Sequence, residues 1–297
     1  MKCDLCPRKC LVDRKKGEKG ICGQTENLKV ARAALHFWEE PCISGDAGSG
    51  AVFFSGCPLH CVFCQNENIA NGTVGKEISV ERLAEIFLEL QEKGANNINL
   101  VTPGHFVPQI TKALDLAKQE GLKLPIVYNT SSYETVETIK RLEGYVDIYL
   151  PDFKYMSPGL SKKYSHAPDY AEVAKAAIAE MVRQTGKAVF VNGDEDNLIL
   201  RGTIVRHLTL PGCMADSMQI LKYLHETYGD MIYISIMNQF TPLSNLEKYP
   251  EFNRRITDEE YETLVDYAIE IGIENGFIQE GDTAEESFIP AFDCEGV

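Results

Sequence analysis

The sequence predicts an α/β fold in which parallel strands form an open, partial barrel and helices cover the outside. From residue 51 onward, short apolar runs alternate with amphipathic helical patterns, which is typical of repeated strand–helix units. About six such units are present, fewer than the eight of a closed barrel. We therefore expect a partial, TIM-like (β/α)6 barrel at residues 46–297, preceded by a small cysteine-rich, metal-binding segment at residues 1–45.

The expected strands and helices follow one another along the barrel. A helix beginning near residue 79 illustrates the pattern, because Ser79 is a typical N-cap and Leu83, Phe87 and Leu90 fall on one face. The expected strands are residues 51–55, 97–101, 125–129, 146–150, 203–210, 231–236 and 276–278. The expected helices are residues 79–94, 107–120, 133–143, 170–185, 216–228 and 258–271.

Both ends of the chain differ from the barrel. The N-terminal segment holds five of the ten cysteines and a flexible turn at residues 15–20. After Gln279 the chain becomes acidic, and we expect a solvated loop there. The acidic residues of this loop are Glu280, Asp282, Glu285 and Glu286. The aromatic stretch at residues 288–292 is expected to fold back over the barrel as a C-terminal flap.

Composition and charge narrow the class of protein. Apolar residues make up 44% of the chain and charged residues 25%, and no apolar run is long enough to span a membrane. The opening Met1-Lys2-Cys3-Asp4 shows no apolar signal segment, so we expect a cytoplasmic protein. In that reducing compartment, ten cysteines favour metal ligation over disulfides. The net charge of −15 disfavours a nucleic-acid partner, because such binding depends on neutralising phosphates.

Three cysteines lie close together immediately after the first expected strand. Cys57, Cys61 and Cys64 (the loop cysteines) are separated by three and then two residues, and Phe63 precedes the last of them. Three thiolates can hold a four-iron cluster while one iron stays open to another ligand. Zinc is the alternative, since it also takes closely spaced cysteines. Zinc usually needs a second close pair, however, and no cysteine follows the motif until Cys213.

A second group of cysteines precedes the barrel. Its members, the head cysteines, are Cys3, Cys6, Cys10 and Cys22. Four thiols can close a tetrahedral zinc site or ligate a second iron–sulfur cluster completely. Either metal would stabilise a segment that is too small to have its own core. Cys42 is interpreted either as a pocket residue or as a small buried apolar residue.

In parallel α/β folds, ligands bind beyond the carboxyl ends of the strands. Asp152 and Lys154 follow one strand and point to the same face, where they form either a structural salt bridge or part of a site. Arg206 and His207 point to opposite faces, and we expect Arg206 to face the interior because a charged side chain among apolar ones needs a partner. The other strand-end candidates are Gly56, Thr102, Pro103, Gly104, His105, Asn129, Ser131, Asn238 and Gln239.

These residues resemble those of the radical S-adenosylmethionine (SAM) superfamily. More narrowly, they resemble a poorly characterised subgroup that is similar to the pyruvate formate-lyase activating enzymes. The resemblance covers nearly the whole chain and includes the head cysteines. Its other segments are residues 57–66, 99–103, 149–154, 206–208 and 292–297.

The resemblance implies a radical SAM oxidoreductase. The loop cysteines would hold a [4Fe-4S] cluster whose open iron binds the amino and carboxylate groups of SAM. One-electron reduction then cleaves the S–C5′ bond and gives a 5′-deoxyadenosyl radical, which removes a hydrogen from the substrate. Lys154 and Arg206 are assigned to catalysis beside the loop cysteines. The residues assigned to cofactor binding are Phe63, Gln65, Asn66, Thr102, Pro103, Gly104, Asn129, Ser131, Asp152 and Asn238.

The resemblance leaves the substrate open. Residues 44–50 are not of the Asp-Gly-Pro-Gly type found in activating enzymes that dock a glycyl-radical loop. The expected substrate is therefore a glycyl radical enzyme, another protein or peptide, or a small molecule. Reduced flavodoxin or ferredoxin is the electron donor that the resemblance implies. A zinc-binding regulatory or scaffold protein without radical chemistry is the alternative function.

Overall fold

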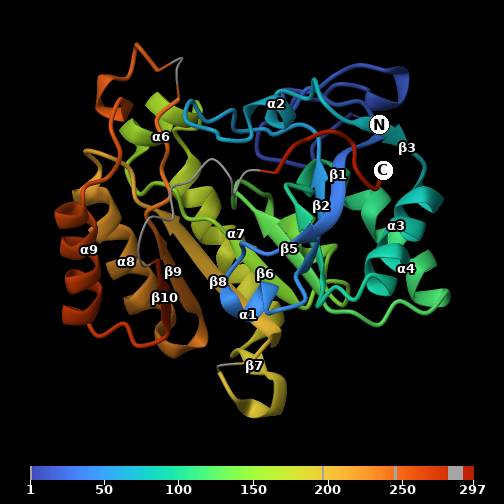
Figure 1. The fold of residues 1–297 in the computed structure, drawn as a ribbon. Helices are drawn as coiled ribbons and strands as arrows, with labels where there is room; N and C mark the ends of the chain where they lie inside the picture. Colours follow the sequence, from blue (N-terminus) through green and yellow to red (C-terminus); the bar gives the residue numbers. More distant parts are fainter. Residues whose placement is uncertain (1, 196, 244–245, 280–289) are drawn as a thin grey trace.

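The chain folds around one open sheet that curves into a partial barrel (Figure 1). The structure is a computed structural model and describes residues 2–195, 197–243, 246–279 and 290–297. Within these residues, the sheet has the strand order β10-β9-β8-β6-β5-β4-β2-β1-β3, and β7 pairs with β8 outside this path.

The elements alternate as the sequence pattern predicts. The strands are β1 Leu28–His36, β2 Ser49–Phe54, β3 Lys76–Ile78, β4 Ile98–Val101, β5 Ile126–Thr130, β6 Ile148–Pro151, β7 Val189–Phe190, β8 Ile199–Leu208, β9 Tyr233–Met237 and β10 Gly276–Ile278. The α-helices are α1 Pro41–Ser44, α2 Glu67–Ala70, α3 Val80–Glu92, α4 Val107–Gln119, α5 Val136–Lys140, α6 Pro158–Ser165, α7 Tyr170–Thr185, α8 Met214–Tyr228 and α9 Asp258–Glu270.

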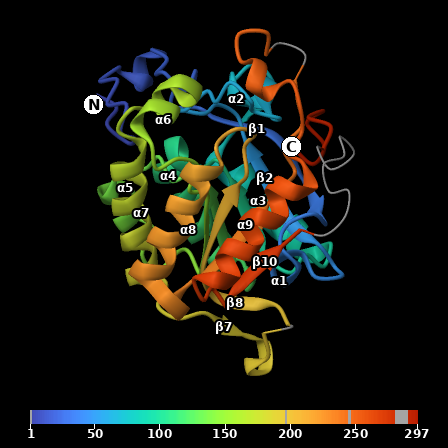
Figure 2. The same cartoon turned by 90° about the vertical axis from the view of Figure 1, so that its left-hand side faces the viewer.

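The strands from β2 to β10 along this sheet are parallel to one another, apart from the peripheral β7. Helices α3, α4, α5, α7, α8 and α9 follow β2, β4, β5, β6, β8 and β9 in the chain and lie on the outside of the sheet (Figures 1 and 2). This arrangement confirms the expected α/β fold with a mostly parallel sheet, because each helix crosses over to return the next strand in the same direction.

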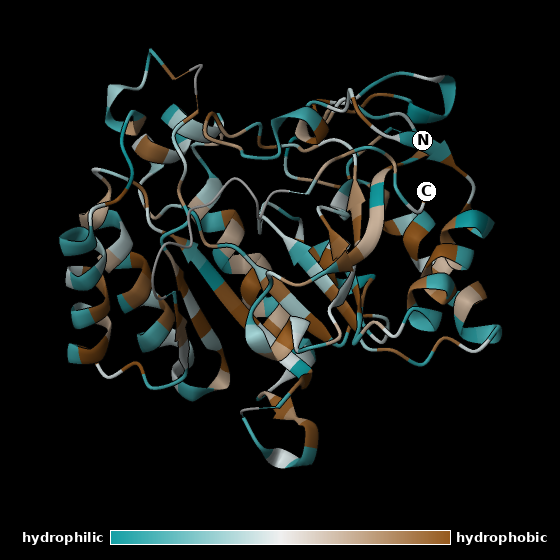
Figure 3. Ribbon diagram, viewed as in Figure 1, coloured by the Kyte–Doolittle hydropathy of each residue, from teal (hydrophilic) through white to brown (hydrophobic). Residues whose placement is uncertain are grey.

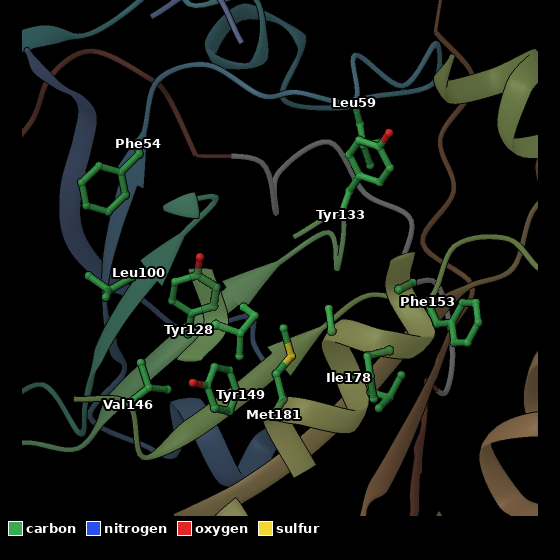
Figure 4. Close-up of a cluster of buried hydrophobic side chains, with 14 of the residues drawn as sticks. Phe54, Leu59, Leu100, Tyr128, Tyr133, Val146, Tyr149, Phe153, Ile178 and Met181 are labelled. Carbon is green, nitrogen blue, oxygen red and sulfur yellow. The ribbon is translucent and has the colours of Figure 1, made fainter. Parts of the chain in front are cut away.

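The core lies between the sheet and the outer helices. Tyr128 on β5 and Tyr149 on β6 are fully buried, as are Ile178 and Met181 on α7 (Figure 4). The strands carry long apolar stretches, whereas the outer helices alternate apolar and polar positions (Figure 3). Burial of this kind fixes the strands rigidly, so the residues at their carboxyl ends occupy defined positions.

Residues 2–27 (the head) lie across the carboxyl ends of the parallel strands (Figure 1). Arg8 donates to the carbonyls of Pro58 and Ser165, which follow β2 and β6. Arg14 donates to the carbonyl of His105, after β4, at 2.5 Å. The head is therefore attached to several strand-end loops at once, and it covers the end of the barrel where ligands are expected.

Strand β1 was not predicted from the sequence. It pairs antiparallel with β2, with His36 opposite Ser49, and it adds an edge to the parallel sheet. Its alanine-rich sequence lacks the continuous apolar run of the parallel strands. Because it also follows directly after the cysteine-rich residues, its strand pattern was not recognised. The chain then turns at Glu40 into the short helix α1, whose buried Ile43 packs against Val127.

Two other boundaries differ from the predictions. The helix expected at residues 133–143 is shorter, because Ser132 adopts a left-handed conformation with φ of +62° and Thr135 caps the helix that follows. The strand expected from residue 203 begins at Ile199, where it first pairs with β7. Near the C-terminus, Phe292 packs edge-on against Phe53, and the amide of Cys294 donates to Ala31 of β1. The acidic loop and the first residues of the aromatic flap lie outside the described residues.

Candidate active site

A cavity of about 440 Å³ lies inside the partial barrel. The loop after β2 forms one wall, and the carboxyl ends of β4, β5, β6, β8 and β9 form the others. Residues 38–41, which follow β1, line it from the opposite end of the barrel. The cavity therefore lies at the carboxyl ends of the parallel strands, which is where this class of fold binds ligands.

The three loop cysteines all line this cavity. Burial raises the pKa of Cys57 to about 11 and that of Cys64 to about 12, and the neighbouring thiols add to both shifts. Lys154 opposes these shifts, because its positive charge favours the thiolate of each loop cysteine. The hydroxyl of Ser165 also donates to Cys61 Sγ at 3.0 Å. The site thus favours thiolate formation once a cation shares the sulfurs.

A network of buried charges spans the cavity from β6 to β8. Lys154 Nζ lies 2.6 Å from Asp152 Oδ2, and Asp152 Oδ1 accepts from Arg206 Nε at 3.0 Å. Arg206 also donates to Asn129 Oδ1 at 2.7 Å. Arg206 lines the cavity, whereas His207 points to the other face and is buried between the Phe153 carbonyl and Ser217.

Glu39 completes this network, and the sequence analysis missed it. Its carboxylate accepts from Arg206 at 2.9 Å, from Asn129 at 3.1 Å and from Asn99 at 3.0 Å. Glu39 follows β1 by three residues, so the failure to predict that strand also hid this side chain. A pair of acidic residues directly before Pro41 is the only sequence signal that could have drawn attention to it.

The charges in this network hold one another ionised. Burial alone would lower the pKa of Arg206 and Lys154, but the adjacent carboxylates outweigh it and raise both values. Burial would likewise raise the pKa of Asp152, but Lys154 and Arg206 keep it below its usual value. Each ion is paired on at least one side, which satisfies the requirement that buried charges be compensated.

Glu40 differs from its neighbour. Its side chain is buried in the cavity wall, and burial raises its pKa although Arg206 opposes the shift. Its Oε2 atom has no hydrogen-bond partner among the described residues. The unsatisfied carboxyl oxygen of Glu40 is thus available for a hydrogen bond with a bound molecule.

The remaining predicted site residues are distributed unevenly. Phe63, Gln65, Asn66, Thr102 and Ser131 line the cavity. Pro103, Gly104 and Asn238 are not among its lining residues. Gly104 instead lies against the buried carboxylate of Glu134, where an added Cβ would collide with it. Thr102 has a φ of +55°, a strained conformation for a β-branched residue at the end of β4.

The donor set of the cavity fits a cluster better than a single ion. In the described part of the chain, no three cysteine, histidine or acidic side chains converge so that they could hold one metal ion. A four-iron cluster makes a different demand, because each thiolate binds its own iron and the sulfurs need not meet at a point. Three thiols around one cavity, with Lys154 beside them, meet that demand.

Residues 51–198 match the family model of the radical SAM superfamily. The chain contains a radical SAM domain. This domain begins at β2 and includes the loop cysteines, Asn129, Asp152 and Lys154. A radical SAM domain indicates an enzyme with SAM-dependent radical chemistry, and that chemistry uses a [4Fe-4S] cluster together with SAM.

Similar proteins agree with the fold. The chain is 27% identical over 276 residues to uncharacterized protein MJ0674 of Methanocaldococcus jannaschii, covering 90% of this chain and 74% of that protein. SuiB of Streptococcus suis, in a crystal structure with S-adenosylmethionine, gives a TM-score of 0.51 at 13% identity, covering 76% of this chain and 48% of SuiB. HydG, a maturase of the [FeFe]-hydrogenase, gives a TM-score of 0.51 at 15% sequence identity. That match covers 78% of this chain and 52% of HydG.

The chain spans about half the length of SuiB and HydG, so their likeness to it concerns the fold of the radical SAM domain. The matches do not single out the subgroup similar to pyruvate formate-lyase activating enzymes. Among the described residues, no helix combines the length and the apolar character needed to cross a bilayer.

Proposed function

We propose that the chain is a radical SAM oxidoreductase that reductively cleaves SAM at a [4Fe-4S] cluster held by the loop cysteines. The observation that carries the proposal is that these three thiols open into the same cavity as the paired charges of Asp152, Lys154 and Arg206. Thiols for the cluster and fixed charges for a zwitterionic ligand thus surround one space. When bound, the cluster would supply the electron that breaks the S–C5′ bond of SAM.

The side chains around the cavity would bind and orient SAM. Lys154 is held by Asp152 beside the loop cysteines, where a cation favours thiolates and attracts the ligand's carboxylate. Asn129 and Asp152 are hydrogen-bonded to Arg206 and are therefore fixed in position for polar contacts with the ribose and amino groups. Because these groups are ordered before the ligand arrives, little freedom is lost on binding.

Aromatic residues would exclude water from the reaction. Phe63 makes edge-to-face contacts with Tyr155, Phe240 and Phe252, with ring centroids 5.5–6.4 Å apart. Phe63 lies between two loop cysteines in the sequence, and it lines the cavity together with Phe240. A dry wall protects a reactive carbon radical from side reactions, which is the contribution that the protein makes to such chemistry.

The substrate that we propose is a glycyl radical enzyme, by analogy with the pyruvate formate-lyase activating enzymes, or else another protein, a peptide or a small molecule. The resemblance of residues 57–66 and 149–154 supports the analogy with the subgroup, whereas residues 44–50 lack the Asp-Gly-Pro-Gly type of sequence that docks a glycyl-radical loop. If no glycyl radical enzyme is activated, the substrate is one of these alternatives. We further propose that reduced flavodoxin or ferredoxin is the donor and that the enzyme works in the cytoplasm, where its thiols stay reduced.

The first experiment tests SAM cleavage itself. The protein is reconstituted anaerobically with iron and sulfide, reduced, supplied with SAM and assayed for 5′-deoxyadenosine. The comparison variant is Cys57→Ala/Cys61→Ala/Cys64→Ala, and the matched control is Cys213→Ala, which removes a buried thiol that does not line the cavity. We expect product from the wild type and the control and none from the triple variant.

Two results would contradict the proposal. Product from the triple variant would show that the loop cysteines are not the site. Zinc without iron in the purified protein, together with no product, would instead favour a zinc-binding regulatory or scaffold protein. The substrate is then tested separately, by looking for a glycyl radical with electron paramagnetic resonance after mixing with a candidate glycyl radical enzyme.

A further inference from the structure

The head lacks a hydrophobic core of its own. Of residues 2–27, those that are buried are Cys6, Arg14, Cys22 and Gln24. Two of these are polar, and the other two are thiols. Leu11 and Ile21, which could have formed a core, are about half exposed, at 52% and 49%. A segment built in this way needs a cross-link or a metal to be stable.

The four head cysteines gather in this segment. A Cβ added to Gly20 would lie 3.2 Å from Cys10 Sγ and 3.6 Å from Cys22 Sγ, so both sulfurs border the same point. Cys6 feels the charge of Cys22 and Cys10, and Cys22 feels that of Cys3 and Cys10. All four are free thiols. Their mutual repulsion when ionised is relieved if metal ions share them.

Backbone amides point at these sulfurs in the pattern that the loop cysteines show. The backbone amides of Arg8 and Gln24, each two residues further along the chain, act to lower the pKa of the Cys6 and Cys22 thiols. The amides of Leu59 and Asn66 act in the same direction on the pKa of Cys57 and Cys64. The amide of Ile21 also donates to Cys10 Sγ at 3.5 Å. Such donors stabilise metal-bound thiolates and tune iron–sulfur clusters.

Zinc and an iron–sulfur cluster require different arrangements of four thiols. A tetrahedral zinc site needs its sulfurs to converge on one ion, with Zn–S bonds of about 2.3 Å. Among the residues that the structure describes, no group of three or more cysteine, histidine or acidic side chains is placed to hold one metal ion. A four-iron cluster gives each thiolate its own iron, so four thiols can ligate it completely without meeting at a single ion.

The head also lies directly against the loop that carries the other three thiols. The carbonyl of Cys22 lies against Gly56, the residue before Cys57. His60, between two loop cysteines, contacts the Ile21 carbonyl through Nε2 at 2.8 Å. A cluster in the head would therefore lie next to the loop that carries the loop cysteines.

The surface of the head is basic in an acidic protein. Residues 1–20 contain seven basic and three acidic side chains, whereas the rest of the chain contains 22 basic and 41 acidic ones. Lys9, Lys15, Lys16 and Lys19 are exposed. An acidic partner is thus attracted to the head and repelled by most of the remaining surface, so charge directs it to this end of the barrel.

We propose that the head cysteines ligate a second iron–sulfur cluster, which relays single electrons from an acidic, low-potential redox protein to the cluster site of the loop cysteines. In each step the carrier protein is oxidised by one electron and the head cluster is reduced by one. The head cluster then returns to its oxidised state by passing that electron on. The relay rests on the function proposed above, whereas the second cluster itself does not.

The cluster is tested in the Cys57→Ala/Cys61→Ala/Cys64→Ala variant, which leaves the head intact. After anaerobic reconstitution, we expect iron with matching sulfide and an electron paramagnetic resonance signal on reduction, both lost when Cys6→Ser and Cys22→Ser are added. Cys294→Ser is the matched control and keeps the metal. The triple variant keeps all four head cysteines. If it binds only zinc, or no metal, the proposal is overturned.

The relay is tested by comparing two reductants. In the Cys6→Ser/Cys22→Ser protein, we expect 5′-deoxyadenosine formation driven by reduced flavodoxin to fall at least tenfold, while formation driven by dithionite changes less than twofold. Lys15→Glu/Lys16→Glu should lower the flavodoxin rate and its salt sensitivity only. Equal losses with both reductants would overturn the relay. If the wild type forms no product with either, the proposed function fails, and the metal content still decides the second cluster.

Discussion

The head and the barrel hold their cysteines by different means. The barrel places the loop cysteines beside a dense apolar core and a buried charge network in which each ion has a partner. The head has two buried thiols and a few polar contacts to loops of the barrel. We therefore expect changes in the barrel to lower the free energy of unfolding of the whole protein, and changes in the head to act locally.

The largest effect should come from Arg206. The change Arg206→Met leaves Asp152 and Glu39 buried without their shared cation, and breaking a buried pair in this way costs about 3–5 kcal/mol. Urea unfolding measures this loss. Lys187→Met is the control, because Lys187 and its ion-pair partner Asp230 are both exposed. A loss no larger than that of the control would show that the network does not stabilise the barrel.

Acid should destabilise the barrel through its buried histidines. Burial lowers the pKa of His207 to about 4, below its unfolded value of about 6.5. The folded state therefore resists protonation, so stability is constant above pH 6.5 and falls as the pH drops from 6.5 to 4, by roughly 3 kcal/mol from this group. His36 and His105, with pKa values lowered by burial to about 4 and about 3, act in the same direction.

The variant His207→Gln tests this pH dependence. Unfolding midpoints are measured between pH 7 and pH 4.5, and the variant should lose less stability over that interval than the wild type, even though it is weaker at pH 7. His225→Gln is the control, since His225 lies on helix α8 and is only half buried. Parallel curves for the wild type and His207→Gln would contradict the predicted contribution.

In the head, Arg8 should matter more for local order than for global stability. Arg8→Met removes hydrogen bonds to the carbonyls of Pro58, Ser165 and His166, and it leaves them to water. We expect the free energy for local opening of the head to fall by about 2 kcal/mol, since hydrogen bonds to charged groups are worth about 1.5–3 kcal/mol. Hydrogen exchange should speed up in the head and in residues 57–66 while the urea midpoint changes little. Lys9→Met is the control. Hydrogen exchange that becomes faster throughout the barrel as well as in the head would contradict the prediction that changes in the head act locally.

The contrast between the two regions also explains what the sequence could predict. The parallel strands and their helices follow strong apolar patterns, so residues 170–185 and 276–278 were predicted with the boundaries that the structure has. The strand-end rule predicted Asn129, Asp152 and Lys154, the need of a buried charge for a partner predicted Arg206, and all four line one cavity. These residues are fixed by regular structure, which local patterns encode.

The parts that were missed depend on long-range packing. β1 has no strong strand pattern of its own and is held by pairing with β2 and by the C-terminal residues. Glu39 follows it and reaches Arg206 only because the chain turns back into the barrel. Gly104 was expected at the ligand because it follows a strand, yet it packs on Glu134. No local pattern encodes such contacts between distant segments.

The smallest expected effect concerns the contact between the two regions at Ser165. Its carbonyl accepts from Arg8 of the head, and its hydroxyl donates to Cys61 Sγ at 3.0 Å. Ser165→Ala should cost about 1–2 kcal/mol of unfolding free energy, because the hydroxyl contacts both Cys61 Sγ and the buried Tyr155 hydroxyl. A donor to a cluster thiolate stabilises the more negative, reduced state, so its loss should lower the reduction potential of the loop cluster.

Potentiometric titration followed by electron paramagnetic resonance measures this shift. Ser161→Ala is the matched control, because Ser161 is also buried on helix α6 but donates to the Pro158 carbonyl instead of a thiol. We expect the potential to become more negative in Ser165→Ala alone. If both variants leave the potential unchanged while Arg8→Met shifts it, the head would influence the cluster through the position of the loop backbone, and the Ser165 hydroxyl would serve only to fill its site.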